Sequence, residues 1–236
     1  MRLIRVNNYE EVSERAAMMI AAQIQLKPDA VLGLATGSSP VGTYQRLVAW
    51  HRAGKLDFSQ IKTVNLDEYV GLDGTDPQSY RYFMEDNLFS HVNIAKENTF
   101  VPNGKADDPA AECAWYDANM ERLGGVDLQL LGIGNNGHIG FNEPADFFTV
   151  ETHLVDLKES TIQANARFFD SPDDVPRQAV TMGTGGIMKA AKVLLIAAGK
   201  EKAELIERAF AGQVTPQIPA TILKLHADCT VIYCGD

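Results

Sequence analysis

Apolar residues gather along the chain in short runs, which alternate with longer segments whose apolar positions recur at helical spacing. Runs with the length and composition of buried strands occupy residues 31–35, 61–66, 126–131, 193–197 and 230–233. Because strands alternate with helices, the pattern predicts an α/β protein with a three-layer α/β/α, Rossmann-like open sheet that is mostly parallel. No repeat, low-complexity tract or linker interrupts residues 1–236, which favours a single domain.

The starts of three helices can be predicted from capping residues. Asn8 followed by Glu11 resembles a capping box ahead of an apolar face that includes Val12, Ala16, Met19, Ile20 and Ile24. Ser39-Pro40 and Asp76-Pro77 each predict an N-cap with proline in the first turn. A closed eight-stranded barrel also fits the length. The open sheet is preferred because loops with chemical character follow only some strands, as at a topological switch point.

Composition narrows the functional classes. The formal net charge of -10 argues against nucleic acid or an anionic membrane as the main partner. No apolar run approaches the roughly 20 residues of a membrane span, and the first residues lack the apolar core of a signal peptide, so we expect a cytoplasmic protein. Cys113, Cys229 and Cys234 are too few and too irregularly spaced for a disulfide framework or a structural zinc site.

The first loop with chemical character follows the strand at 31–35 and reads GLATGSSPVGTY over residues 33–44. Backbone N–H groups at a helix start, with the hydroxyls of Thr36, Ser38 and Ser39 around Gly37, suit a phosphate dianion. The alternative is a turn that collects Gly and Ser for helix capping alone. The loop lacks the Gly-Lys-Ser/Thr of a Walker A sequence and the Gly-x-Gly-x-x-Gly spacing, which disfavours ATP and NAD.

Two further loops carry ionisable groups. The sequence NLDEY at 65–69 places Asp67 and Glu68 at the carboxyl end of a strand, where open parallel sheets hold ligands. One of them could act as a base; alternatively, Asp67 caps the next turn and Glu68 is solvated. The sequence GIGNNGHIGFNEP at 132–144 surrounds His138 with glycines and adds Glu143. That combination suits acid/base chemistry near neutral pH, although a glycine-rich turn with an incidental histidine fits the same residues.

Together these segments resemble the glucosamine-6-phosphate deaminase family across nearly the whole chain. The resemblance includes NARFF at 165–169 and GKEKA at 199–203, and GHIGFNEP at 137–144 is its most specific part. It implies conversion of glucosamine 6-phosphate to fructose 6-phosphate and ammonia, with ring opening by His138, orientation of His138 by Glu143 and enolisation by Asp67. The implied chemistry is redox-neutral and requires no nicotinamide, flavin, pyridoxal or metal.

The resemblance also implies that Arg167 and Lys202 bind the phosphate of a small sugar-phosphate substrate. On local grounds alone, Lys202 would be a surface helix residue and Arg167 would pair with Asp170. Two departures from the family pattern stand out. Asn136 replaces an Asp that many members place before Gly-His, so Glu143 is the nearer support for an imidazolium. The acidic and aromatic stretch at 145–155 is a poor partner for an effector phosphate, so we expect a non-allosteric enzyme. The chain ends soon after Tyr233 and lacks material that the hexameric members use, so we expect a monomer or small homo-oligomer.

Two other functions compete with this interpretation. A 6-phosphogluconolactonase shares the phosphate loop and the Gly-His neighbourhood, but its hydrolysis does not call for the carboxylate of Asp67. A non-catalytic sugar-phosphate-sensing domain would bind the ligand without turning it over. Such sensors usually carry a DNA-binding module, and no basic helix-turn-helix segment is evident in this chain. The presence of both Asp67 and His138 favours catalysis.

Overall fold

All five predicted apolar runs form strands of one parallel sheet in the computed structural model, which describes residues 1–169 and 171–236. These strands are almost entirely buried, as expected for strands covered on both faces: β2 (Val31–Leu34), β3 (Lys62–Asn65), β6 (Leu128–Leu131), β9 (Val193–Ala198) and β10 (Cys229–Cys234). The sheet has seven strands in the order β1-β10-β9-β6-β2-β3-β5, and all its pairs are parallel. It is open, so the barrel is excluded and the predicted fold class is confirmed.

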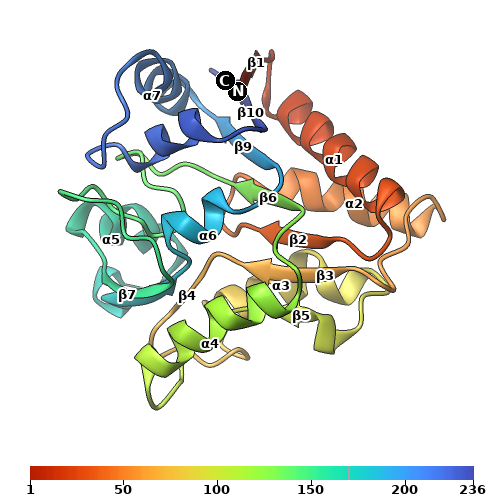
Figure 1. Ribbon diagram of the computed structural model, residues 1–236, viewed down its shortest axis with the longest axis horizontal. Coiled ribbons are helices and arrows are strands. Elements are labelled where there is room, and N and C mark those ends of the chain that lie inside the picture. Colours follow the sequence, from red (N-terminus) through yellow and green to blue (C-terminus); the bar gives the residue numbers. More distant parts are fainter. Residues whose placement is uncertain (170) are drawn as a thin grey trace.

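The two edge strands, β1 (Arg2–Arg5) and β5 (Thr99–Phe100), were not predicted. β1 is polar and largely exposed and β5 is two residues long, so neither produces an apolar run. Both chain ends lie at the β1–β10 edge of the sheet (Figure 1).

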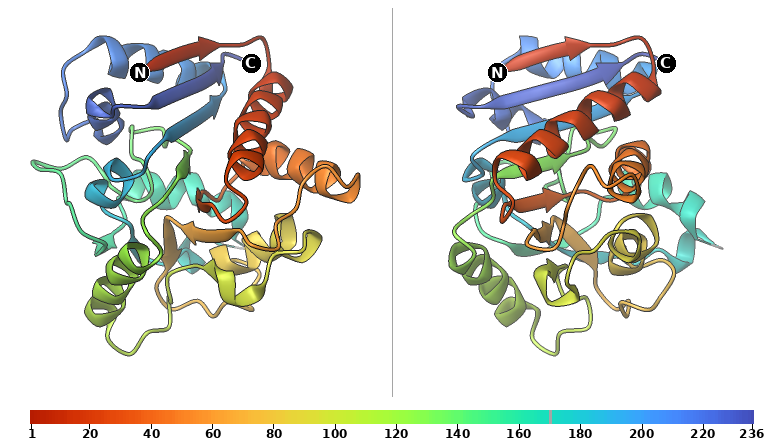
Figure 2. Two further views of the ribbon diagram at one scale, coloured as in Figure 1. Left: turned by 45° about the vertical axis from the view of Figure 1, so that its right-hand side comes forward. Right: turned by 90° about the vertical axis from the view of Figure 1, so that its right-hand side faces the viewer.

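Helices cover both faces of the sheet (Figure 2). One face carries α1 (Tyr9–Leu26), α2 (Val41–Arg52) and α3 (Tyr80–Asn87); the other carries α4 (Pro109–Arg122), α6 (Thr184–Met188) and α7 (Lys200–Ala211). This division follows from right-handed crossovers, because the chain moves toward β5 in its first half and back toward β1 afterwards. The connection that leaves β2 leads toward β5, whereas the connection that leaves the neighbouring strand β6 leads toward β1. The loops that leave these two strands therefore flank a topological switch point, where open sheets bind ligands.

Short elements complete the chain. They are α5 (Glu159–Asn165) and the 3-10 turns η1 (Phe89–His91), η2 (Lys96–Asn98), η3 (Ala166–Phe168), η4 (Pro172–Asp174) and η5 (Pro219–Leu225). No helix in the described ranges has both the length and the apolar character needed to cross a membrane.

A second, antiparallel sheet was not predicted. It consists of β4 (Asp67–Tyr69), β8 (Gln178–Thr181) and β7 (His153–Asp156) in that order. A single residue, Leu66, separates β3 from β4, so the segment interpreted as a loop is in fact a strand paired with β8. A small apolar cluster separate from the main core lies against this sheet and includes Tyr69 and Phe141.

The helix starts confirm one predicted cap and correct two. The Asn8 side chain accepts a hydrogen bond from the Glu11 N–H at 2.9 Å, as expected. Ser39 does not cap α2. The Gly42 N–H instead donates to the Tyr9 hydroxyl at 2.8 Å, so the first turn of α1 satisfies the start of α2.

Asp76 shapes the turn before α3 rather than capping the helix. Its side chain accepts from the Gln78 N–H at 2.8 Å, and the cap is Ser79, which accepts from the Tyr82 N–H at 3.0 Å. The helix thus begins about one turn later than predicted, and the Asp-Pro pair lies in the turn before it.

Candidate active site

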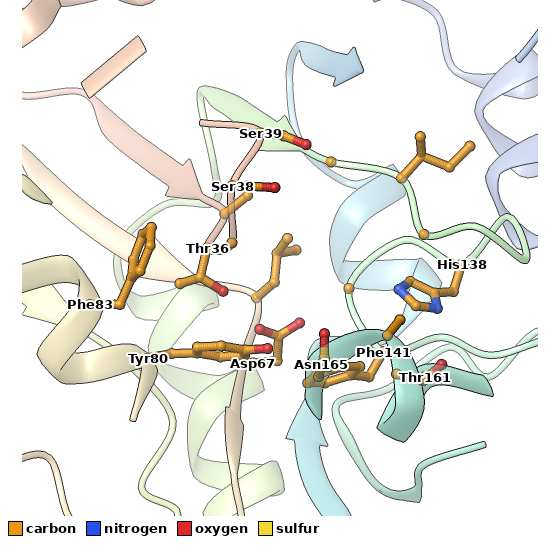
Figure 3. Close-up of a pocket in the computed structure, with 18 of the residues that line it drawn as sticks. Thr36, Ser38, Ser39, Asp67, Tyr80, Phe83, His138, Phe141, Thr161 and Asn165 are labelled. Carbon is orange, nitrogen blue, oxygen red and sulfur yellow. The ribbon is translucent and has the colours of Figure 1, made fainter. Parts of the chain in front are cut away.

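A cavity of about 720 Å³ lies at the carboxyl ends of the central strands, beside the switch point. It brings together the loops after β2 and β6, the start of β4, the α5–η3 segment and the first turn of α7 (Figure 3). Every predicted site residue except Glu143 lines this cavity: Thr36, Gly37, Ser38, Ser39, Asp67, Asn136, His138, Arg167 and Lys202. Glu143 is buried and lies behind His138.

One end of the cavity has the character of an anion site. The loop after β2 turns at Gly37, whose φ of 84° favours glycine, and then enters α2. The Arg167 guanidinium lies 3.5 Å from the Ser38 hydroxyl. Lys202 is half-buried on the first turn of α7, and burial together with Arg167 lowers the pKa of its ammonium group. The positive charges of Lys202 and Arg167 repel each other, so an anion bound between them would stabilise both.

The local alternatives for these two cations fare differently. Lys202 is not a plain surface residue, because it lines the cavity. The pairing of Arg167 with Asp170 falls outside the described residues.

The loop after β6 leaves no room for a side chain at Gly134. A Cβ atom there would lie 2.2 Å from the His138 Nε2 atom, so only glycine allows the ring to fold back over this turn. The turn closes with a 3.0 Å hydrogen bond from the Gly134 N–H to the His138 carbonyl, and Gly137 adopts a φ of 88°. The glycines therefore set the position of the imidazole and are not incidental.

Glu143 supports His138 from the side away from the cavity. Its Oε2 atom lies 3.5 Å from His138 Nδ1 and accepts a 2.6 Å hydrogen bond from Asn136 Nδ2. Its Oε1 atom accepts a 2.5 Å hydrogen bond from the Thr161 hydroxyl. Burial alone would raise the pKa of Glu143, but His138, Thr161 and Asn136 together bring the pKa below its ordinary value. The charged carboxylate is thus available to an imidazolium, and Asn136 orients it without adding charge.

Asp67 has the opposite environment. It is the first residue of β4, is only 6% exposed, and opens into the cavity (Figure 3). Burial, and then the neighbouring charge of Glu68, raises the pKa of Asp67 to about 8. A carboxylate held in such surroundings gains strength as a base near neutral pH.

Glu68 is not solvated, so the alternative in which its side chain lies in solvent is wrong. It is 2% exposed, and its carboxylate accepts hydrogen bonds from the N–H groups of Tyr69, Tyr80 and Arg81, each at 2.9 Å. Burial raises the pKa of Glu68 to about 7, against the opposing effect of these three donors. The side chain ties β4 to the first turn of α3 and thereby holds Asp67 at the edge of the cavity.

An aromatic wall was missed at the sequence level. Tyr69, Tyr80 and Phe141 have ring centroids within 6.0 Å of one another, and Phe83 also lines the cavity. Asn165 on α5 donates to the Tyr69 hydroxyl at 2.9 Å. The spacing of Tyr80 and Phe83 at i and i+3 indicates only a buried helix face, so nothing in the pattern separates cavity lining from core.

The chain matches the family of glucosamine-6-phosphate isomerases and 6-phosphogluconolactonases over residues 6–232. A glucosamine-6-phosphate deaminase of Clostridium perfringens is 59% identical over 236 residues, covering 100% of this chain and 98% of that protein. One of Lachnoclostridium phytofermentans is 59% identical over 234 residues, covering 99% of each.

Solved structures agree with these relatives. The structure of a monomeric glucosamine-6-phosphate deaminase has a TM-score of 0.97 and 48% identity, covering 99% of this chain and 97% of that one. A 6-phosphogluconolactonase from Thermotoga maritima, with a TM-score of 0.76, 20% identity and coverage of 100% and 99%, shares the fold. By sequence and by fold over nearly its whole length, this chain belongs to the glucosamine-6-phosphate isomerase/6-phosphogluconolactonase family.

Proposed function

We propose that this protein is a glucosamine-6-phosphate deaminase, which converts glucosamine 6-phosphate and water to fructose 6-phosphate and ammonia. One observation carries the proposal. A single cavity has a hydroxyl- and cation-rich end formed by Thr36–Ser39, Arg167 and Lys202, and an acid/base end formed by Asp67 and His138. The relatives named glucosamine-6-phosphate deaminase at 59% and 48% identity support it, whereas the lactonase neighbour at 20% identity speaks for the fold alone.

The phosphate group would anchor the substrate. The N–H groups and hydroxyls of residues 36–39 surround one side of it, and Arg167 and Lys202 supply charge-assisted hydrogen bonds from the other. Binding energy from this remote group then holds the sugar in place for reaction at C1 and C2.

Ring opening falls to His138. In its neutral form the imidazole accepts the proton of the C1 hydroxyl and delivers a proton to the ring oxygen as the C1–O5 bond breaks. Glu143, 3.5 Å from Nδ1, stabilises the transient imidazolium. Nε2 is the ring nitrogen left for the substrate.

Isomerisation and loss of nitrogen follow. Asp67 removes the proton from C2, an enolamine forms, and the proton returns to C1 to give a 2-imino ketose. Water adds to the C=N bond and the resulting carbinolamine expels ammonia, which leaves fructose 6-phosphate. Protons and electrons balance within these steps, so no redox cofactor takes part.

The test is ammonia formation from glucosamine 6-phosphate by the purified protein, with chelator present and no cofactor added. We expect equal amounts of ammonia and fructose 6-phosphate, and no hydrolysis of 6-phosphogluconolactone above the uncatalysed rate. Lactone hydrolysis without ammonia release would replace the proposal by a lactonase. Binding of glucosamine 6-phosphate without turnover would indicate a sensing domain.

We further propose that the protein acts as one catalytic domain spanning residues 1–236, as a monomer in the cytoplasm. The solved relative at 48% identity is described as monomeric. Cys113, Cys229 and Cys234 are buried and free, which fits a reducing compartment.

A further inference from the structure

The two oxygens of the Glu143 carboxylate have separate tasks. Oε2 faces both His138 Nδ1, at 3.5 Å, and Asn136 Nδ2, at 2.6 Å. Oε1 faces only Thr161 among the described residues, with its hydroxyl at 2.5 Å. The carboxylate is buried, so its orientation depends on these few partners rather than on water.

Thr161 comes from a different part of the chain than the other partners. Asn136, His138 and Glu143 share the loop after β6, whereas Thr161 is the third residue of α5 and is 3% exposed. Helix α5 runs directly into η3, which carries Arg167 at the phosphate end of the cavity. The hydroxyl is therefore a direct link between this helix and the carboxylate beside His138.

We propose that Thr161 is a positioning residue whose hydroxyl holds Glu143 Oε1, so that Oε2 stays directed at His138 Nδ1. The inference rests on the proposed function and adds a residue to its machinery. Without the hydroxyl, Oε1 would be a buried acceptor with no partner, and the carboxylate would rotate to share the Asn136 amide between its oxygens. His138 Nδ1 is itself buried and has no hydrogen bond of good geometry among the described residues, so it has no second acceptor to replace Oε2.

Holding Oε2 in place has a specific consequence for the imidazole. A carboxylate fixed beside Nδ1 keeps the proton of the neutral ring on Nδ1 and leaves the Nε2 lone pair for the substrate. Loss of the fixed carboxylate lets the ring populate the other tautomer, whose Nε2 cannot accept a proton. The effect falls on the chemical step and leaves phosphate binding intact.

The test compares Thr161→Val, which removes the hydroxyl at nearly constant volume, with Thr161→Ser, which retains it. Nitrogen-15 shifts of the His138 ring, assigned with His138→Gln, report the tautomer in the ligand-free protein. We expect the Nδ1–H form in the wild type and in Thr161→Ser, and a mixture of tautomers in Thr161→Val. In the ammonia assay Thr161→Val should lose about tenfold or more in kcat, with KM within about twofold of the wild type, and Thr161→Ser should recover most of the activity.

An unchanged His138 tautomer in Thr161→Val overturns the inference, and so does a rise in KM with kcat unchanged, which would make Thr161 a direct substrate contact. Thr161→Ala repeats the measurement if the valine does not fold. The ligand-free spectra do not depend on the reaction. If the wild type makes no ammonia while the tautomer shifts as expected, the proposed function fails and the positioning role stands.

Discussion

The surroundings of two carboxylates in the same site shift their pKa values in opposite directions. Asp67 is buried beside Glu68, and the pKa of Asp67 is raised to about 8. Glu143 is also buried, but it has donors on both oxygens and a pKa below its ordinary value. Such a separation of pKa values is how one site provides both a base and a permanent charge. It supports the proposed roles of Asp67 in proton abstraction and of Glu143 in stabilising the imidazolium.

Replacement of Asp67 tests the first assignment. Asp67→Asn keeps the shape of the side chain and removes the base, so kcat for ammonia formation should fall by about 10²–10⁴-fold. The phosphate end is untouched, and KM should change little. A variant with more than about a tenth of the wild-type kcat would contradict the role of Asp67 as base.

The same substitution should have a pH-dependent effect on stability. Because the pKa of Asp67 is raised from 3.8 to about 8 on folding, the folded state binds more protons than the unfolded state between these values. The free energy of unfolding therefore falls as pH rises through this window. Asp67→Asn removes that loss, so denaturant titrations should show the variant gaining on the wild type from about pH 4 to pH 8, with no further gain above.

Asp57 provides the matched control for this stability effect. It is exposed, and hydrogen bonds led by the Ser59 N–H lower the pKa of its carboxyl group. Asp57→Asn should therefore show no gain with rising pH. A gain for both variants, or for neither, would mean that the buried charge of Asp67 does not set the trend.

Replacement of His138 should reduce the activity far more than replacement of Asn136. His138→Gln should lose most of the activity, because glutamine cannot carry a proton between the C1 hydroxyl and the ring oxygen. Asn136→Asp should change the pH profile of kcat/KM only modestly, since Glu143 already places a charge 3.5 Å from His138 Nδ1. Steady-state rates across the pH range measure both, and a fully active His138→Gln protein would refute the assignment.

At the level of elements, the sequence pattern predicts the strands that are buried on both faces and misses the strands that are short or polar. All five apolar runs became central strands, because a continuous apolar run fits only a covered strand. β4 reads as a polar loop, yet it pairs with β8, which lies far along the chain. The residues predicted for the site lie in or beside one cavity, whereas the contact of Thr161 with Glu143 depends on where α5 folds back, which no local pattern encodes.

The side chain of Glu68 holds the start of α3 against β4. Its carboxylate satisfies N–H groups of Tyr80 and Arg81 at the start of α3, in addition to that of Tyr69 on β4. Glu68→Ala would leave these donors without their acceptor and should lower the free energy of unfolding by about 2–4 kcal/mol. Glu85→Ala is the control, because Glu85 lies on α3, the helix whose first turn Glu68 contacts. It removes a more exposed ion pair with Arg81 and should cost less than about 1 kcal/mol. Equal losses in chemical denaturation would deny Glu68 this role.

At the scale of the whole molecule, the fold gathers residues that are distant in sequence at one edge of the sheet. The chain reverses direction between β2 and β6, so the phosphate loop and the His138 loop become neighbours. Sequence patterns predict this juxtaposition because the carboxyl ends of parallel strands share an edge. They do not predict the α5–η3 segment as a wall of the site, since its position depends on contacts with Glu143 and with Tyr69 of the second sheet.

Regulation is also a property of the whole molecule. Residues 145–155 lack lysine and arginine, and Phe147 and Val150 among them are exposed. An effector phosphate finds no strong charge-assisted donor in such a stretch.

Cooperative substrate binding requires either several coupled sites or a second global state that an effector selects. The proposed monomer has no coupled sites in partner subunits, so rates should follow a hyperbola in glucosamine 6-phosphate, and N-acetylglucosamine 6-phosphate should not activate. Initial-rate curves with and without that compound, alongside light scattering for a mass near 25.8 kDa, measure both properties. Sigmoidal rates relieved by the compound would refute this prediction, and the effector would then have to act at a site or an assembly outside this stretch, because acidic and aromatic side chains cannot replace the missing cations.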